Sequence, residues 1–503
     1  MIHLLTIFGA SGDLTARKLI PALYELELAR RLPEPLAVVG VARRPYSDAQ
    51  WRKRLEESVR RSVTQFDGDV WRSFEKRLFY FDGDVSREST FAALNVFLRQ
   101  REEQLAADSG LSEHGAATNR VYYLALAPDR YAETVRHLAE AGMTAETPEN
   151  QRRIIVEKPF GRSRETAQAL NAELHRALNE SQIFRIDHYL GKETVNNIFV
   201  LRFANTIFEP VWNRTFVDHV EITAHESNTV AERGAFYETA GVLRDMFQNH
   251  LLQLLAVTAM EPPTRFDAEQ VRDEKVKLIR AIRSTENVPD SALFGQYEGY
   301  RHEKSVAPDS HVPTFAALRL FIDNSRWKDV PFYLRSGKGM SCATTQIVIQ
   351  FRRPPHLIFE PDGDRSDSLS AAAVDANRLL IQIQPAEGIR LSFLTKIPGT
   401  ETRLRTSELV YTFADDSVPL ISAYERLLLD ALDGDAALFA RDDEIDAAWR
   451  VIDPLTQMQI EAPLYGYKTG GWGPDESAAW LANDQRRWFD QCPVLIPVGV
   501  ADR

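Results

Sequence analysis

Short apolar runs alternate with helical patterns over the first 160 residues of the chain. The first run, 3–8, is separated by a glycine-containing turn from a segment in which leucine recurs at helical spacing. Further strand candidates lie at 36–41, 77–81, 121–126 and 153–156, and helical spacing occurs at 51–63 and 88–104. Strands that alternate with helices are typical of βαβ crossovers. We therefore predict an α/β, Rossmann-like, doubly wound dinucleotide-binding domain over residues 1–184.

The pattern changes near residue 185. Strand candidates now follow one another through turns or loops instead of helices, at 217–224, 314–322, 332–334, 346–352, 378–384 and 390–396. Long helical patterns lie near 191–205, 243–260 and 422–432, and the Asp/Ser/Ala-rich stretch 362–375 predicts a loop. We expect a larger C-terminal α+β domain with a mostly antiparallel sheet over residues 185–503.

Composition narrows the class of protein. The 503 residues are 44% hydrophobic and 26% charged, and 60 Lys+Arg against 72 Asp+Glu give a net charge of −12, which argues against a non-specific nucleic-acid or anionic-membrane binder. Only two cysteines, Cys342 and Cys492, exclude a disulfide scaffold and a Cys-based zinc finger. There is no secretory signal pattern, and no apolar stretch approaches the roughly 20 residues of a membrane span. We expect a cytoplasmic protein.

The first strand candidate ends in a Gly9-x-x-Gly12 turn. Glycines in this position let the backbone approach a pyrophosphate, whose charge then rests on amides at the helix N-terminus. A plain strand–helix turn is the alternative. Arg43 and Arg44 follow the second strand candidate, where NAD sites usually carry a carboxylate. Their forked donors suit a 2′-phosphate, which favours NADP, although they could also be two solvated surface arginines.

Lys158 follows the last strand candidate of the first domain. We expect it to face a cleft between the domains, with the Lys158–Pro159 bond a candidate cis peptide. A surface lysine beside a turn is the alternative.

His188 and Lys192 lie four residues apart in an ionisable segment at 185–193. On a helical turn they would share one face, and a paired imidazole and ammonium suit a phosphate monoester. The alternative is a helix entry with a structural histidine.

Asp245 and His250 begin a long apolar helical pattern. Five residues correspond to about 140° on an ideal helix, so the two would pair only if the chain were irregular between them. A buried core histidine is the alternative. No HExxH, GxSxG or metal-ligand cluster is evident, so we expect no metal and no acyl transfer.

Together these segments resemble the glucose-6-phosphate dehydrogenase family, and the resemblance covers nearly the whole chain. Its most specific part is the string Arg-Ile-Asp-His-Tyr-Leu-Gly-Lys-Glu at 185–193. The other matching motifs lie at 9–14, 157–161, 201–205, 244–252, 272–277, 334–338, 423–427 and 471–474.

The resemblance implies oxidation of β-D-glucose 6-phosphate at C1, with hydride transfer to NADP and 6-phosphogluconolactone as product, the first step of the oxidative pentose phosphate pathway. His250 matches the general base, and Asp245 matches the carboxylate that orients it and contacts the sugar. The other candidate substrate contacts are Lys158, His188, Tyr189, Lys192, Glu226 and Lys338. The candidate cofactor contacts are Gly9, Ala10, Ser11, Gly12, Asp13, Leu14, Arg43, Arg44, Asp84, Val85, Tyr123 and Lys158. The family also implies a homodimer or homotetramer formed through the large sheet.

One departure from the family concerns Ala343, which stands where a Lys or Arg is usual near the substrate. We expect a raised KM for glucose 6-phosphate with kcat less affected. Two other readings stay open: a related sugar dehydrogenase acting on an unphosphorylated sugar, and a catalytically silent sugar-phosphate sensor.

Overall fold

The computed structural model describes residues 1–111, 116–285, 290–356, 358, 376–399, 404–413, 421–492 and 495. The chain divides into two compact units. The first unit comprises Met1–Gly191, Pro263–Asp273 and Ile421–Asp446, and the second comprises Lys192–Pro262, Glu274–Leu420 and Ala447–Arg503. The predicted boundary lay between residues 184 and 185. The first unit instead continues to Gly191 and also includes the two later segments. The loop predicted at 362–375 lies outside the described residues.

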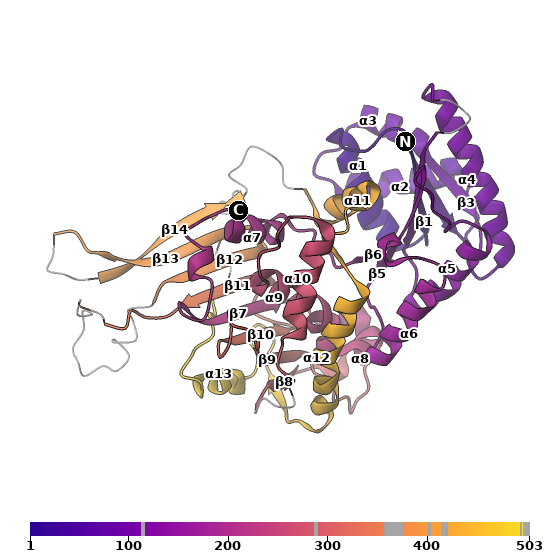
Figure 1. Cartoon of the computed structure of the whole chain (residues 1–503). Coiled ribbons are helices and arrows are strands. Elements are labelled where there is room, and N and C mark those ends of the chain that lie inside the picture. The colour runs from indigo at the N-terminus through magenta and orange to yellow at the C-terminus, as the bar shows by residue number, and fades with distance from the viewer. Residues whose placement is uncertain are drawn as a thin grey trace. The chain divides into compact units, whose positions relative to one another are not determined.

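The first unit is built on a parallel sheet (Figure 1). Its strands are β1 (Ile2–Phe8), β2 (Leu36–Ala42), β3 (Leu78–Asp82), β4 (Thr118–Leu124), β5 (Asn150–Glu157), β6 (Ile183–Ile186) and β15 (Phe439–Ala440). They lie in the order β15-β6-β5-β4-β1-β2-β3, and only β15 runs antiparallel to its neighbour. The order reverses between β1 and β4, where dinucleotides bind in doubly wound sheets. The predicted Rossmann-like domain is confirmed, while β6 and β15 were not predicted.

Helices connect the strands of this sheet. They are α1 (Ile20–Leu28), α2 (Asp48–Ser62), α3 (Gly68–Phe74), α4 (Glu88–Asp108), α5 (Tyr131–Glu140) and α6 (Arg164–His175). Between β1 and α1 the chain forms a short π-helix, η1 (Thr15–Leu19). β1, β2 and β4 are buried almost throughout, as expected for a sheet covered on both faces.

Helix α11 (Ala423–Asp433) belongs to the first unit, although the sequence analysis placed it in the C-terminal domain. The carbonyl oxygen of Leu432 accepts hydrogen bonds from Asn119 Nδ2 and from Arg153 Nη1, each at 2.7 Å. Both donors lie on buried positions of β4 and β5. The last turn of α11 therefore accepts hydrogen bonds from buried side chains of the parallel sheet, about 280 to 310 residues away in the sequence.

The second unit contains a larger sheet, and the predicted mostly antiparallel arrangement is confirmed. The strands are β7 (Val217–His225), β8 (Ala292–Tyr297), β9 (Phe315–Phe321), β10 (Pro331–Gly337), β11 (Thr344–Phe351), β12 (Arg378–Gln384), β13 (Gly388–Lys396), β14 (Leu404–Thr412) and β16 (Leu464–Tyr467). They lie in the order β14-β13-β12-β11-β7-β10-β9-β8-β16 (Figure 1). The pairs β7–β10 and β8–β16 are parallel. β8, β14 and β16 were not predicted.

The helices of the second unit include a long irregular segment. They are α7 (Glu193–Phe203), α8 (Gly234–Val242), the π-helix η7 (Leu243–Leu251), α9 (Leu252–Ala259) and α13 (Asp475–Ala482). Two further helices, α10 (Ala268–Arg280) and α12 (Asp442–Glu461), carry the chain from residues of the first unit into residues of the second. No helix among the described residues is both long and apolar enough to cross a membrane.

The two cysteines lie side by side. Cys342 and Cys492, 150 residues apart in the sequence, form a disulfide with a Cα–Cα distance of 6.5 Å. Two cysteines in 503 residues exclude a scaffold of disulfides, and this single bond is no such scaffold. The sequence did not predict that these two residues would meet.

Candidate functional site

The turn after β1 requires glycine at its first position. Gly9 has φ = +89°, and a Cβ atom there would lie 2.0 Å from the carbonyl oxygen of Ala125. The amides of Gly9 and Ala10 both donate to Val41 O at the end of β2, at 2.9 and 3.2 Å, and Gly12 N donates to Gly9 O at 2.9 Å. The turn is thereby fixed against β2 and β4, with no side chain at its narrowest point.

A pocket of about 510 Å³ opens beside this turn within the first unit. It is lined by Gly9, Ser11, Val41, Ala42, Arg43, Arg44, Gly83, Val85 and Leu126. Five of the candidate cofactor contacts, Gly9, Ser11, Arg43, Arg44 and Val85, are therefore brought together. The pocket lies at the carboxyl ends of the parallel strands, where doubly wound sheets bind nucleotides.

Tyrosine hydroxyl groups form hydrogen bonds with the arginines at one end of this pocket. Tyr46 OH accepts hydrogen bonds from Arg44 Nη1 at 3.1 Å and from Arg54 Nη1 at 3.2 Å. Arg54 Nη2 also donates to Ser11 O at 3.4 Å, and Tyr80 OH donates to Arg44 O at 2.5 Å. Arg54 is a third cation beside the glycine turn, and the sequence analysis missed it because it lies on α2, away from any motif.

Other candidate cofactor residues do not line the pocket. Tyr123 is fully buried, and its hydroxyl donates to Glu157 Oε1 at 2.5 Å. Asp84 accepts from the amide and hydroxyl of Ser86, and these hydrogen bonds, the amide first, lower the pKa of its carboxyl group. Ala10 is buried, with its carbonyl oxygen accepting from Trp51 Nε1 at 3.1 Å. The remaining ones, Gly12, Asp13, Leu14 and Lys158, are not among the lining residues either.

Lys158 leaves the end of β5 through a cis peptide bond to Pro159, as the sequence suggested. The preceding Glu157 carries a half-buried carboxylate that accepts from Tyr123 and, at 3.3 Å, from Tyr424 OH. Burial raises the pKa of Glu157 although both hydroxyls stabilise its charge. The segment that carries Lys158 is thus held by tyrosines from β4 and α11, of which Tyr424 was not singled out as a site residue.

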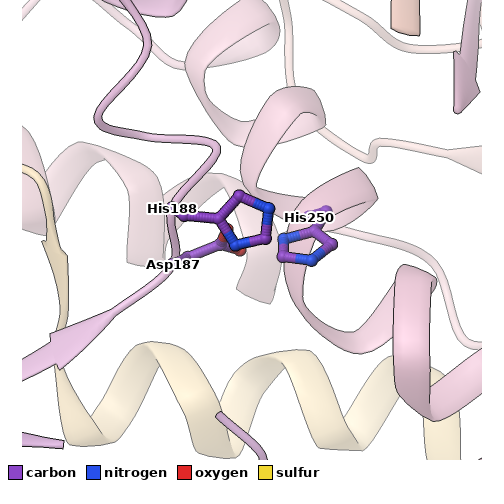
Figure 2. Close-up of side chains that lie close together, drawn as sticks. All are labelled: Asp187, His188 and His250. Carbon is purple, nitrogen blue, oxygen red and sulfur yellow. The ribbon is translucent and has the colours of Figure 1, made fainter. Parts of the chain in front are cut away.

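His188 lies in the turn after β6, not on a helix (Figure 2). Tyr189 follows it in the same turn. Asp187 Oδ1 accepts from Tyr189 N and Asp187 O accepts from Leu190 N, each at 3.0 Å. The His188 ring is nearly parallel to that of Tyr424, with centroids 6.5 Å apart. Helix α7 begins only at Glu193, so the predicted helical face shared by His188 and Lys192 is wrong.

In the second unit, Glu226, Lys338 and Asp245 converge. β7 and β10 are parallel neighbours with His225 opposite Gly337, so the next residue of each strand leaves the sheet at the same place. Lys338 Nζ forms an ion pair with Glu226 Oε2 and lies 3.7 Å from Asp245 Oδ2. It also lies 5.4 Å from the centre of the Tyr237 ring. These are three of the candidate sugar contacts, brought together from segments that lie up to 112 residues apart.

Asp245 and His250 lie on the π-helix η7. The His250 side chain is drawn in Figure 2. A π-helix closes hydrogen bonds between residues five apart, so these two positions stack one turn above the other. On an ideal α-helix these two side chains would not pair, and the chain between them is irregular, as a pairing requires. His250 is 1% exposed and its amide donates to Asn249 Oδ1. The same turns also bury Gln248 and Asn249, so the surroundings of the ring are not simply apolar.

Lys192 is the N-cap residue of α7. Burial lowers the pKa of its ammonium group, and the negative charge of Glu387 opposes this shift. Glu387 lies in the turn between β12 and β13, 195 residues after Lys192 in the sequence. No motif of the sequence pointed to it.

One cluster in the first unit offers metal-ligand atoms. His175, Glu180 and Asp442 bring a ring nitrogen and two carboxylates within 4.8 Å of one another. Both oxygens of Glu180 already accept from the guanidinium group of buried Arg185, at 2.5 and 3.0 Å. We assign no metal to this cluster.

Comparisons with known proteins agree on one family. The model of the glucose-6-phosphate dehydrogenase NAD binding domain matches residues 6–197, and that of the glucose-6-phosphate dehydrogenase C-terminal domain matches residues 199–489. A glucose-6-phosphate 1-dehydrogenase from Aggregatibacter actinomycetemcomitans is 41% identical over 498 residues, 96% of each chain. The enzyme of the same name from Bacillus subtilis strain 168 is 38% identical, covering 97% of this chain and 98% of the relative.

Solved structures match over the same length. A glucose-6-phosphate dehydrogenase in complex with its substrate glucose-6-phosphate superposes with a TM-score of 0.86 at 33% identity, covering 97% of this chain and 98% of the other. Glucose-6-phosphate 1-dehydrogenase from Mycobacterium avium gives 0.82 at 33% identity over 98% and 99%. Both units and the order of their elements are thus accounted for by a single family: the chain belongs to the glucose-6-phosphate dehydrogenases.

Proposed function

We propose that this protein oxidises β-D-glucose 6-phosphate at C1 to 6-phosphogluconolactone, the first step of the oxidative pentose phosphate pathway. The observation that carries the proposal is the convergence of Glu226, Lys338 and Asp245 beside the π-helical turn of His250, in a chain of this family. An ammonium group between two carboxylates offers donors and acceptors together, as a polyhydroxylated substrate requires.

His250 takes the proton of the C1 hydroxyl group in this proposal. Hydride departure leaves positive character on the carbinol carbon, and removing the hydroxyl proton at the same time stabilises the forming carbonyl group. An imidazole has an ordinary pKa near 6.5, which suits a general base at neutral pH. Asp245, one π-helical turn earlier, orients the ring and stabilises the imidazolium as it forms.

The 6-phosphate group is bound by His188, Tyr189 and Lys192, and Lys158 contacts both sugar and cofactor. An ammonium group and a protonated imidazole form charge-assisted hydrogen bonds with phosphate oxygens, which are roughly twice as strong as neutral ones. This binding energy distinguishes the phosphorylated sugar from glucose. It also argues for a phosphate-specific enzyme over a dehydrogenase of unphosphorylated sugars.

NADP is the proposed cofactor, and it supplies the hydride acceptor at C4 of its nicotinamide. The pocket of the first unit fits a dinucleotide, because it opens beside the glycine turn at the carboxyl ends of the parallel strands and two arginines line it. The adenosine 2′-phosphate would be held by Arg43 and Arg44, both exposed at the end of β2. No carboxylate is among the residues that line this pocket, so nothing there repels the extra phosphate.

A homodimer or homotetramer is proposed on the basis of strand β14. It is the last strand of the described sheet, and Leu409, Val410 and Tyr411 on it are 61, 55 and 46% exposed. Exposed apolar residues on an edge strand favour association with another chain. We also propose the cytoplasm as the compartment.

Steady-state kinetics tests the function directly. Formation of NADPH from NADP, or of NADH from NAD, is measured at 340 nm with glucose 6-phosphate and with glucose. We expect turnover, a strong preference for the phosphorylated sugar and a preference for NADP. A silent sugar-phosphate sensor would bind glucose 6-phosphate without turnover, and an enzyme for unphosphorylated sugars would show no preference for the phosphate.

The cofactor preference has its own variants. Arg43→Ala and Arg44→Ala each remove one donor set, and each should raise the KM for NADP on the order of tenfold, since a hydrogen bond to a charged group contributes about 1.5–3 kcal/mol. The KM for NAD should change little. Equal effects on the two cofactors would contradict recognition of the 2′-phosphate.

A further inference from the structure

The turn between β12 and β13 carries a carboxylate that the proposed mechanism does not use. This turn ends at Glu387, and Gly388 begins β13. A Cβ atom on Gly388 would lie 2.4 Å from Tyr411 O, so the strand fits closely against β14. Phe413 N donates to Glu387 O at 3.0 Å, which fixes the main chain of the turn. Glu387 is therefore presented from a rigid support.

The side chain of Glu387 reaches the first turn of α7. Its Oε2 atom accepts a hydrogen bond from Thr194 N at 2.9 Å and a second one from the Thr194 hydroxyl group. The N-cap residue of this helix, Lys192, provides no side-chain cap of its own. A helix N-terminus carries unpaired amides and a partial positive charge, both of which a carboxylate satisfies. Glu387 thus caps α7 from a distant part of the sequence.

The residue fixed by this cap is Lys192. Its ammonium group is partly buried, and Glu387 is the one carboxylate whose charge raises the pKa that burial lowers. Among the described residues, Lys192 forms no ion pair within 4 Å, so Glu387 acts on it through space while its Oε2 atom is held by Thr194. Glu387 thus opposes the effect of burial on the pKa of Lys192 without forming a direct ion pair with it.

We propose that Glu387 is a positioning residue for recognition of the substrate phosphate group. It fixes the start of α7, and with it the place of Lys192, and it supplies a negative charge that favours the charged form of the ammonium group. This inference rests on the proposed function, in which Lys192 binds the 6-phosphate. Glu387 itself touches neither substrate nor cofactor in this scheme.

Two variants separate the effect of the Glu387 charge from the effect of the cap on α7. Glu387→Gln keeps an oxygen that can accept from Thr194 but removes the charge, whereas Thr194→Val removes the hydroxyl donor and keeps the charge. Glu298→Gln, at an exposed turn residue of the same unit, is the matched control. For each variant we would measure kcat and KM for glucose 6-phosphate, kcat/KM for glucose, and the Kd of glucose 6-phosphate by calorimetry.

Glu387→Gln should raise the KM and Kd for glucose 6-phosphate on the order of tenfold, equivalent to about 1.4 kcal/mol. Its kcat and its kcat/KM for glucose should stay within about twofold of the unmodified protein, because glucose has no phosphate for Lys192 to bind. Thr194→Val should have a smaller effect on KM, and Glu298→Gln none.

Three results would overturn this role. An equal loss with glucose and glucose 6-phosphate would show that Glu387 only supports the fold. An unchanged Kd would show that its charge is not felt at the phosphate, and a tighter Kd would show that the carboxylate repels it. If the unmodified protein bound no glucose 6-phosphate, the proposed function itself would fail, which the calorimetric arm distinguishes from failure of the Glu387 role alone.

Discussion

Asp245 connects two groups of side chains in the second unit. Its carboxylate lies 3.7 Å from Lys338 Nζ, and its position on η7 is one π-helical turn before His250. Lys338 also pairs with Glu226, and because Lys338 and Asp245 are both buried, loss of either one leaves a poorly solvated charge on the other. Substitutions at these positions are therefore expected to be strongly non-additive, as for residues that act as one unit.

The role of His250 is tested by His250→Asn. A positioned general base contributes roughly 10²–10⁴ in rate, so kcat should fall by about this factor while the Kd for glucose 6-phosphate changes little. The control is His302→Asn, at an exposed residue of the same unit. Full turnover of the His250 variant would eliminate the proposed mechanism.

Ala343 is exposed directly before β11, close in sequence to Lys338. Ala343→Arg should lower the KM for glucose 6-phosphate by roughly tenfold to a hundredfold, because a charge-assisted hydrogen bond contributes about 1.5–3 kcal/mol, and kcat should change less. Ala343→Met gives comparable length without the charge and should leave KM unchanged. The same KM in both variants would remove the idea that a missing cation weakens phosphate binding.

Two helical elements, η7 and α11, are packed against strands that lie far from them in the sequence. The π-helix η7 contacts β7 and β10, and α11 ends against polar side chains of β4 and β5. Asp430 on α11 is buried and paired with Arg426. Burial nevertheless raises the pKa of Asp430 to about 6, since desolvation outweighs the stabilising arginine.

This shift makes the stability of the first unit depend on pH. The pKa of Asp430 is higher in the folded state than the ordinary 3.8, so the folded state favours the protonated form. Stability is greatest below that ordinary value and is lost as pH rises towards about 6. At 1.36 kcal/mol per unit, the loss is about 2–3 kcal/mol.

Asp430→Asn should remove this pH dependence. Urea unfolding at pH 4 and pH 7, followed by circular dichroism, should show a smaller decrease in stability for the variant than for the unmodified protein. Glu57→Gln, at an exposed position of α2 in the same unit, is the control. Parallel pH profiles for all three proteins would contradict the assignment.

On the scale of the whole chain, the C-terminal segment 484–492 contacts several strands of the second unit. Asp484 binds Arg319 at 2.8 Å, and Arg486 binds Asp218 at 2.9 Å. Phe489 N donates to Glu221 Oε2 at 3.0 Å on β7. The disulfide from Cys492 to Cys342 then attaches this segment to the loop that follows Lys338. The segment thus joins strands that lie far apart in the sequence.

Loss of this bond should destabilise the second unit. Cys342→Ser should lower the free energy of unfolding by about 2–4 kcal/mol in the absence of reductant, as is typical of a disulfide that closes a long loop. Unfolding in urea with and without dithiothreitol measures the effect. The reductant should reduce the stability of the unmodified protein and leave the variant unchanged. Identical curves for the two proteins without reductant would show that the thiols are not bonded in solution, as a reducing cytoplasm would favour.

The sequence by itself determined whatever depends on local pattern. Apolar runs separated by helical spacing predicted the parallel sheet, because a strand buried on both faces must be apolar along its length. Gly9 was predicted as part of a close turn, and its positive φ with no room for a Cβ atom explains why. The motif at 185–193 was specific enough to indicate the family, although its backbone conformation was not the helical turn expected.

Only the tertiary structure decided what depends on contacts between distant segments. The π-helical turn between Asp245 and His250 has no signature in a 3.6-residue period, and β14 is too exposed on both faces to show strand alternation. Tyr424, Arg54 and Glu387 reach their partners only after strands and helices pack, since side-chain charge and capping act through space and not along the chain. Local spacing specifies the elements, whereas the electrostatics of a site is fixed by which elements meet.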